Sequence, residues 1–460
     1  MQYHRPLVFA ENHQQTGASY FPGYVFAFPV LLRQKPESSW GFWRKNCTVE
    51  MMYRTKFILV SFLAGSAFAQ PSFDLVQLES MAMQSSRAVL AARDQLTAAR
   101  AAVDSAAAFP NPEIEFQKGA VRARGPGGNA GDARSATLTQ PLDLPWQRTP
   151  RVAAAEAALD ASSAGLRAFE ADLLARLRTR YFELLKRQAE LKNSLEDREL
   201  MENVRSRIEL RVKVGEAPRF ELIKADAETL NAQKVAQAAA FRVDQARSLL
   251  RQAVGQSLPE DFAVEGSLRS VPDVQPLDQL RTEMGKANPE IERARAELVR
   301  AERLLELERN RRWPSLALKV SRDEDPDIRT SSVGVVMSVP LWDRRRGPVG
   351  EAAAQLSRAR HELAAQDFSL GQGLEVAYQQ YEIAQTQVTA LESGIVRQAE
   401  AALKVAEAAY RFGERGFLEV LDAQRVYRAA RAELINARYE LATAWVEIER
   451  LRAVPGGKKP

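Results

Sequence analysis

VGEAPRFELIKA (residues 214–225) and FGERGFLEVLDA (residues 412–423) are two copies of one segment, set about 198 positions apart. Gly215 of the first copy corresponds to Gly413 of the second, and a glutamate follows each glycine. A glycine placed between two helical runs predicts a tight turn. An internal duplication with so long a period restricts the architecture before any single residue is considered, because each copy must form a comparable unit.

The duplication extends outward from both turns. Before the first turn, the sequence predicts a helix at 73–108, a strand at 113–116, a Gly/Pro-rich loop at 122–135 and a returning strand at 136–142. The two arms of a helical hairpin follow at 150–212 and 219–255, on either side of the turn. The same order surrounds the second turn, at residues 284–311, 315–320, 322–331, 333–339 and 348–454. Pro150 is suited to the first turn of the long helix that follows it.

Apolar side chains recur at alternating spacings of three and four residues along both long helices. Leu177, Tyr181 and Leu184 are examples in the first helix. In the second, the series is Leu370, Leu374, Ala377, Tyr381, Ala384, Val388, Leu391 and Ile395. A period of 3.5 residues keeps one helix face turned towards a partner helix, so the sequence predicts coiled-coil packing.

Four predicted strands, apolar on one side, are too few to close a barrel, since about eight strands form the smallest membrane barrel. Open sheet edges are not tolerated in lipid. The strands must therefore combine with strands of other copies of the chain. Three copies would supply twelve strands, although strand counting alone does not select three copies over four.

Composition excludes several functional classes. Net charge is only +5, and the 64 basic and 59 acidic residues are interspersed along helices, which argues against a nucleic-acid partner. Cys47 is the single cysteine, so no disulfide framework is possible. His361 is the only histidine between residues 70 and 460, which excludes a site that needs two imidazoles. We expect no cofactor, no metal site and no enzymatic activity.

Residues 51–69 have the pattern of a secretory signal peptide, with a basic start, a short apolar core and small residues before Gln70. We interpret residues 1–50 as an upstream extension from a misassigned start codon, with initiation at Met51 or Met52. No other stretch reaches the roughly 18 apolar residues of a membrane-spanning helix. The protein is therefore expected to leave the cytoplasm and to enter a membrane only by strands.

These patterns divide the chain into two repeats and their flanking segments. We expect an upstream extension at residues 1–50 and a signal peptide at 51–69. The first repeat at 70–255 is joined by a linker at 256–283 to the second repeat at 284–454, and a tail follows at 455–460.

The chain resembles the TolC-type outer-membrane efflux family over nearly all of residues 70–454. The resemblance rests on the duplicated order of elements, on the two Asn-Pro-Glu openings at residues 111–113 and 288–290, and on the glycine-containing turns. It implies a mainly α fold with membrane β-strands, in which a homotrimer forms a twelve-stranded β-barrel in the outer membrane. A helical barrel continues this channel across the periplasm.

The resemblance also implies partners. Members of the family accept substrates from an inner-membrane pump, here expected to be of the resistance-nodulation-division type, through a periplasmic adaptor protein. Outer-membrane lipid would surround the strands. The chain itself would be a passive duct.

Candidate gate residues follow from the same resemblance. The acidic ring that narrows the periplasmic mouth in the family falls on Glu419 and Asp422, and Glu419 departs from the family's aspartate. Arg415 matches an arginine of the turn that helps to hold the mouth closed, and Glu221 is the first-repeat counterpart of Glu419. Carboxylates gathered around an axis concentrate cations and repel anions. The alternative is that these acids are ordinary solvated residues, favoured by the dipole at a helix N-terminus.

Gly215 and Gly413 have two expected roles. They permit a tight turn between antiparallel helices. At exposed helical tips, they would also mark docking points for the adaptor.

PLDLPWQRTPRVAAAEAAL (residues 141–159) resembles the matching turn in exporters of the cobalt-zinc-cadmium type, but departs at Trp146, where that branch commonly has glycine. We therefore favour heavy-metal export. A drug-efflux channel and a channel for type I protein secretion or polysaccharide export stay open as alternatives. A soluble periplasmic coiled-coil adaptor or scaffold is an alternative of a different class, which the strands at 315–320 and 333–339 disfavour.

Overall fold

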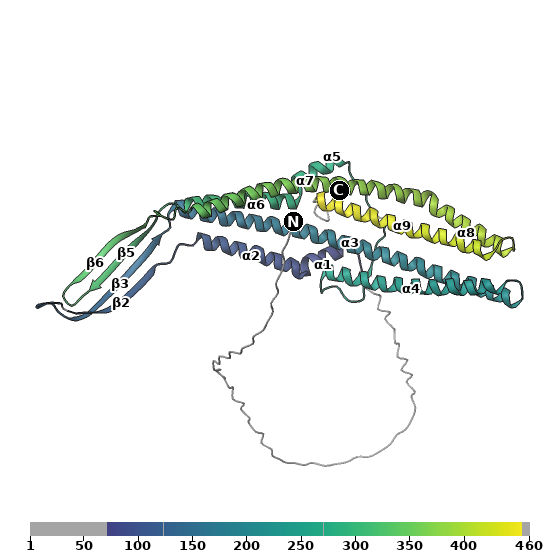
Figure 1. The fold of residues 1–460 in the computed structure, drawn as a ribbon, viewed down its shortest axis with the longest axis horizontal. Helices are drawn as coiled ribbons and strands as arrows, with labels where there is room; N and C mark the ends of the chain where they lie inside the picture. The colour runs from purple at the N-terminus through teal and green to yellow at the C-terminus, as the bar shows by residue number, and fades with distance from the viewer. Residues whose placement is uncertain (1–70, 123, 270, 453–460) are drawn as a thin grey trace, which may run out of the picture. The chain divides into compact units, whose positions relative to one another are not determined.

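A computed structural model describes residues 71–122, 124–269 and 271–452 of the chain (Figure 1). The expectations that lie outside these residues concern the upstream extension, the signal peptide and the tail, at 1–50, 51–69 and 455–460. None of the helices in the described ranges is long and apolar enough to cross a membrane.

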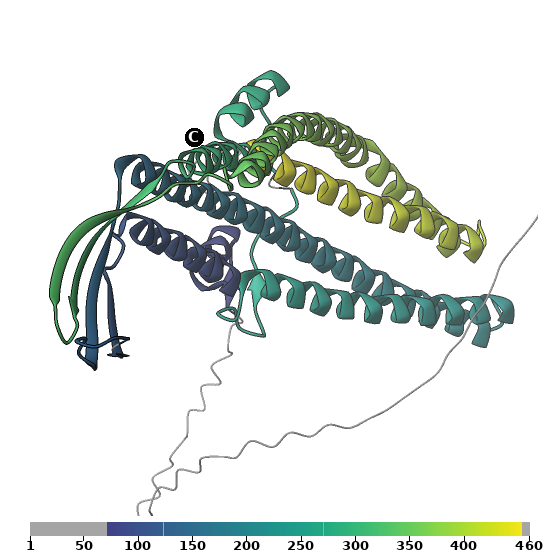
Figure 2. The ribbon, with the colours of Figure 1, turned by 60° about the vertical axis from the view of Figure 1, so that its left-hand side comes forward.

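Long helices, one four-stranded sheet and one short two-stranded sheet make up the described chain. In chain order the elements are β1 (Ser72–Phe73), α1 (Leu75–Ser85), α2 (Arg87–Ala107), β2 (Glu113–Val121), β3 (Gly131–Leu142), α3 (Pro145–Lys213), α4 (Arg219–Val254), β4 (Ala263–Val264), α5 (Leu277–Ala287), α6 (Pro289–Asn310), β5 (Ser315–Glu324), β6 (Arg329–Ser338), α7 (Arg346–Ala390), the π-helical turn η1 (Leu391–Ile395), α8 (Val396–Arg411) and α9 (Phe417–Arg452). Figures 1 and 2 show the sheet at one end of α3 and the α3–α4 turn at the other. The duplicated order of elements is confirmed.

The first helix of each repeat is broken, whereas the sequence predicted one continuous helix. Ser86 separates α1 from α2, and Asn288 separates α5 from α6; both residues are buried. The Asn288 side-chain oxygen accepts hydrogen bonds from the backbone N–H of Glu290 (2.9 Å) and Ile291 (3.2 Å), which caps α6. Its amide nitrogen donates to the Leu451 carbonyl (2.8 Å) and so fixes the break against the end of α9.

These breaks change two expectations. Helix α5 crosses the expected boundary between linker and second repeat at residues 283 and 284. The two Asn-Pro-Glu openings occupy different places, because the first leads into β2 while the second begins α6. The shared letters therefore do not mark equivalent positions of the two repeats.

Helix α3 starts five residues earlier than predicted. Pro145 takes its first position, where the missing N–H has no intrahelical partner to lose. Pro150 lies inside the helix as a buried residue, so it costs one backbone hydrogen bond and contributes packing instead.

The predicted coiled-coil periodicity is confirmed over most of its length. Leu177, Tyr181 and Leu184 are buried in a cluster shared by α1, α3, α4, α9 and the linker. In the second hairpin the series stays buried or half-buried as far as Leu391, but Ile395 is 51% exposed. The π-helical turn η1 inserts an extra residue and rotates the following side chains, so the buried face resumes at Ala399 and Leu403.

Two tyrosines, one on the first long helix of each repeat's hairpin, hold the linker. Tyr181 donates from its hydroxyl to the Glu265 carbonyl, and Tyr381 donates to the Pro272 carbonyl at 3.3 Å. A Cβ on Gly266 would lie 2.0 Å from the Tyr181 hydroxyl, so only glycine fits this contact. The linker is thereby attached to both long hairpins.

The four-stranded sheet has the order β2-β3-β5-β6, and all of its pairs are antiparallel, whereas the short strands β1 and β4 form a parallel pair. Its strands run farther into the loops than predicted. β3 begins inside the expected loop 122–135, and β5 and β6 pair through most of the expected loop 322–331, from which only residues 325–328 stay outside the strands. The predictions ended the strands where charged residues begin, but residues 322–324 form a regular ladder with residues 329–331.

Candidate gate at the helical tips

The two helical hairpins turn in the same way. Gly215 and Gly413 have positive φ angles of 80° and 75°. A backbone hydrogen bond from the residue after each glycine reaches back into the preceding helix, from Glu216 to Arg211 at 2.8 Å and from Glu414 to the carbonyl of residue 409 at 2.9 Å. A Cβ at either glycine would meet nothing within 4 Å. The positive φ, and not a lack of space, therefore requires glycine.

A hydrogen bond joins the two hairpins near these turns. The Tyr410 hydroxyl on α8 donates to the Glu221 carboxylate on α4 at 3.1 Å. The Arg211 guanidinium lies 4.9 Å from the centre of the Tyr410 ring, and the Phe417 ring centre lies 5.9 Å from it. Burial raises the pKa of Tyr410, and the negative charge of Glu221 raises it further. The phenol therefore stays a hydrogen-bond donor at any physiological pH.

The candidate acids of the second tip are divided by their partners. Arg415 donates to the carboxylate of Glu419, and both side chains are exposed. Asp422 is exposed and makes no ion pair with any residue that the structure describes. The structure thus brings Arg415 and Glu419 together, places Glu221 against Tyr410, and gives Asp422 no charged partner among the described residues.

Apolar packing lies beneath these polar contacts. The tip cluster contains Ile208 of α3, Ala225 of α4, Leu403 of α8 and Phe417 of α9, and Phe417 is 1% exposed. Because all four helices contribute, the two hairpins form one packed end in this conformation. Any opening of the tips must separate part of this cluster.

Three arginines on α9 add charged contacts to the first hairpin, and we call them the arginine ladder. Their partners are Arg425 with Glu228 (2.5 Å), Arg428 with Asp197 (3.2 Å) and Arg431 with Glu196 (2.5 Å). Burial raises the pKa of Asp197, while Arg428 and Arg431 oppose the shift. The first-repeat counterparts of the ladder are Ala227, Leu230 and Gln233, none of which is charged.

Sequence reasoning missed Tyr410 and the arginine ladder. The available signal was the difference between the repeats, since Val212 stands where the second repeat has Tyr410. A polar group that occurs in only one repeat is not needed for the fold that both repeats share, so it has a role specific to that repeat. Its partner on the other hairpin, however, becomes visible only in three dimensions.

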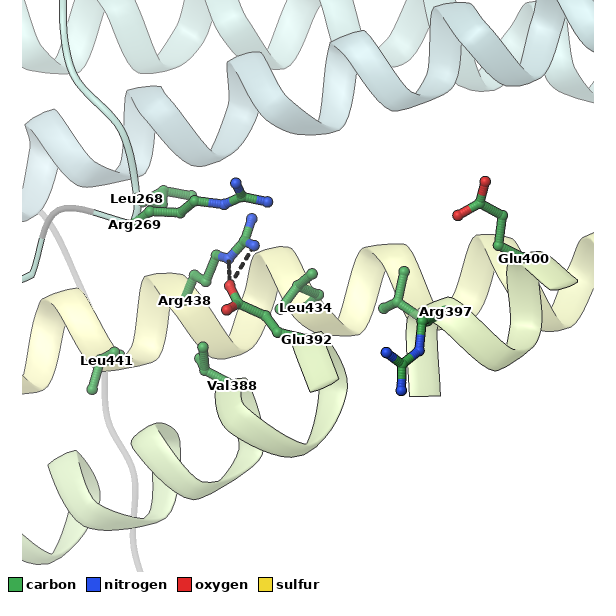
Figure 3. Close-up of a pocket in the computed structure, with 10 residues that line it drawn as sticks. Leu268, Arg269, Val388, Glu392, Arg397, Glu400, Leu434, Arg438 and Leu441 are labelled. Carbon is green, nitrogen blue, oxygen red and sulfur yellow. Dashed lines mark hydrogen bonds and ion pairs between the residues drawn. The ribbon is translucent and has the colours of Figure 1, made fainter. Parts of the chain in front are cut away.

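A hollow of about 500 Å³ lies beside the π-helical turn (Figure 3). Glu392 in this turn accepts a 2.8 Å hydrogen bond from Arg438 of α9, and Figure 3 shows Arg269 of the linker beside this pair. Arg397 and Glu400 line the hollow farther along α8. The irregular turn is thus fixed to α9 by a charged contact.

Across the described residues, no group of three or more His, Cys, Asp or Glu side chains is arranged to hold a metal ion.

Comparisons with known proteins agree with this architecture. A family model described as outer membrane efflux protein matches residues 78–256 and 280–453. The chain is 26% identical over 374 residues to the cobalt-zinc-cadmium resistance protein CzcC of Cupriavidus metallidurans, which is 81% of this chain and 88% of that relative. It is also 26% identical over 321 residues to the outer membrane efflux protein BepC of Brucella suis biovar 1, covering 67% of this chain and 69% of BepC.

The fold is shared with solved structures. The outer-membrane channel OprN superposes with a TM-score of 0.72 at 21% identity, over 82% of this chain and 89% of that one. The family model spans more than half of the chain and includes both helical turns and the strands β2, β3, β5 and β6. These matches favour a channel over a soluble adaptor. The chain therefore belongs to the outer membrane efflux protein family, as an efflux channel of the outer membrane.

Proposed function

We propose that three copies of this chain form the passive exit duct of a tripartite efflux system for heavy-metal cations. The observation that carries the substrate class is the similarity to a cobalt-zinc-cadmium resistance protein, which extends over 81% of this chain. The stretch at residues 141–159 supports the same class, despite the tryptophan at position 146.

The edges of the sheet support assembly from several copies. β2 and β6 lie at the two edges, and unpaired edges are not tolerated in lipid. Pairing of β6 of one copy with β2 of the next would remove all edges. Three copies would give a twelve-stranded barrel, within the range of bacterial outer-membrane proteins. The number three follows the TolC-type resemblance.

The gate in this proposal is the end formed by the two hairpins. The bond from Tyr410 to Glu221 and the arginine ladder hold the second hairpin against the first. Glu419 and Asp422 of three copies would surround the axis and concentrate cations there. Opening would move α8 and α9 away from α3 and α4.

The remaining assignments follow from the same reading. The repeats at 70–255 and 284–454 would form the near-equivalent halves of each subunit, joined by the linker at 256–283. The turns at Gly215 and Gly413 would dock to a periplasmic adaptor. An inner-membrane pump of the resistance-nodulation-division type would supply the driving force, so the duct needs neither a cofactor nor a catalytic residue.

Metal tolerance of a deletion strain tests the substrate class. Loss of the gene is expected to lower tolerance to zinc, cadmium or cobalt, and a plasmid copy is expected to restore it. Unchanged metal tolerance together with lost drug tolerance would assign the duct to drug efflux. A defect confined to secreted protein would assign it to type I secretion.

A further inference from the structure

The two faces of the sheet differ in polarity. One face, which we call the lipid face, carries apolar side chains that are 40–79% exposed, including Ile114, Phe116, Leu138, Val320, Val333 and Val335. The opposite face carries Glu113, Glu115, Thr137, Thr139, Lys319 and Ser321. Along β3, residues 136 and 140 of the lipid face are half-buried like residues 135, 137 and 139 of the polar face, so side-chain polarity and not burial distinguishes the two faces. An outer-membrane channel turns its apolar face to lipid, so the polar face is the inner side.

At the end of the sheet that is distant from the helices, charged side chains replace the apolar side chains of the lipid face. Strand register places one row of side chains across all four strands, namely Lys118, Arg134, Glu324 and Arg329. Arg322 lies one row closer to the apolar residues, and Asp132 lies one row farther away. We call these six residues the rim cluster. Four are basic and two are acidic, so the cluster carries a net positive charge.

The rim cluster lies at the height of lipid headgroups. Leu142 lies eight residues after Arg134 in β3, which is about 26 Å along the strand and about 20 Å along the membrane normal after the usual tilt. Trp313 and Trp342, both exposed, flank the other end of the apolar zone. The whole zone then matches the apolar band of about 25 Å that outer-membrane barrels present. Since the helices extend into the periplasm, the rim cluster faces the outer leaflet.

Charge pairing inside the cluster leaves two arginines available. Lys118 lies 3.0 Å from Asp132, and Arg329 pairs with Glu324. Arg134 is 3.9 Å from Asp132, which is a weak contact, and Arg322 makes no ion pair with any described residue. A hollow of about 330 Å³ is lined by these two arginines together with Lys118 and Glu324, and Phe116 borders it.

The geometry points to an anionic lipid as the occupant of this hollow. We propose that Arg134 and Arg322 bind the phosphate of a phosphorylated glycolipid in the outer leaflet, whose acyl chain lies along Phe116. Guanidinium groups suit this ligand, because their planar donors match phosphate oxygens in a bidentate way. The apolar border suits the chain that continues from the headgroup into the membrane. A soluble anion would use the arginines but not Phe116.

The first test compares two lipids on the unaltered protein. The full-length protein in detergent is titrated with a bisphosphorylated glucosamine-disaccharide glycolipid and with the same lipid after removal of its phosphates, and binding is followed by native mass spectrometry. The phosphorylated form is expected to bind at least tenfold more tightly. Equal binding of the two forms would overturn the proposal, and this comparison needs no variant.

The second test uses matched variants. Arg134→Gln with Arg322→Gln is expected to reduce affinity for the phosphorylated lipid by roughly tenfold or more. Lys319→Gln removes a cation from the polar face of the same sheet and is expected to change affinity less than about twofold. Equal losses in both variants, competition by millimolar inorganic phosphate, or loss of binding on chelation of divalent cations would each contradict direct arginine–lipid contact.

Discussion

The Tyr410 hydroxyl at the end of α8 donates a 3.1 Å hydrogen bond to the Glu221 carboxylate at the start of α4. These residues lie 189 positions apart in the chain and belong to different hairpins. The bond therefore has to break, or its two helices have to move together, whenever one hairpin is displaced from the other. This contact makes the proposed gate accessible to single substitutions.

Tyr410→Phe removes the bond and keeps the ring between Arg211 and Phe417. A hydrogen bond to a charged group contributes about 1.5–3 kcal/mol, so the closed tips should lose a comparable amount at most. We expect a higher resting conductance in planar bilayers. Tyr427→Phe is the matched control, because no hydrogen bond connects the Tyr427 hydroxyl to a described residue of α4. Equal conductance of Tyr410→Phe and the unaltered protein would show that this hydrogen bond does not help to hold the tips closed.

Alkaline pH should break the hydrogen bond from Tyr410 to Glu221 and open the tips. The pKa of Tyr410 in the folded protein is raised above its ordinary value of 10.0, first by burial and then by Glu221. The bond's contribution to stability is therefore fully present below pH 10 and is lost as pH rises through the higher folded value. Conductance should stay constant from pH 7 to about pH 10 and rise above it. A rise of the same size in Tyr410→Phe would assign the pH effect to another group.

The acids of the second tip should contribute unequally to cation binding. Because Arg415 neutralises Glu419, we expect Asp422→Asn to remove most of the block that divalent cations cause in bilayer recordings. Glu419→Gln should have a smaller effect, and Arg415→Gln should strengthen the block by releasing the Glu419 charge. If Asp422→Asn leaves the block unchanged, Asp422 is not part of a constriction.

Alanine at Gly215 or Gly413 should destabilise the protein through backbone strain. A non-glycine residue at positive φ costs about 1–2 kcal/mol. Gly165→Ala is an internal control with the opposite sign, since Gly165 lies within α3, has nothing within 4 Å of a Cβ, and should become more stable by about 0.5–1 kcal/mol. Thermal unfolding of the three variants measures both effects. A destabilised Gly165→Ala would show that the helix is constrained by contacts outside one chain.

Local sequence patterns were sufficient for the repeated scaffold. Alternation predicted the four strands, and the positive φ of Gly215 and Gly413 agrees with the turn expected from the duplicated segment. Both signals depend on neighbours along the chain, which explains why they could be recognised without a structure.

Features that depend on distant partners could not be predicted. The break at Asn288 needs the Leu451 carbonyl, 163 positions away, and the strand pairing of charged residues 322–324 needs their neighbours across the sheet. The π-helical turn at 391–395 has no proline, so the apolar series predicted a continuous face through Ile395. The hydrogen bond from Tyr410 to Glu221 could not be predicted either, because it leaves no trace in the apolar periodicity and joins residues of different hairpins.

Zinc efflux from preloaded cells tests the central claim most directly. Cells that lack this gene are loaded with zinc, transferred to zinc-free medium, and compared with complemented cells by elemental analysis over time. We expect zinc to leave several times faster when the channel is present and the pump and adaptor are intact. Equal rates of zinc loss with and without the channel would contradict its role as the exit duct for metal cations.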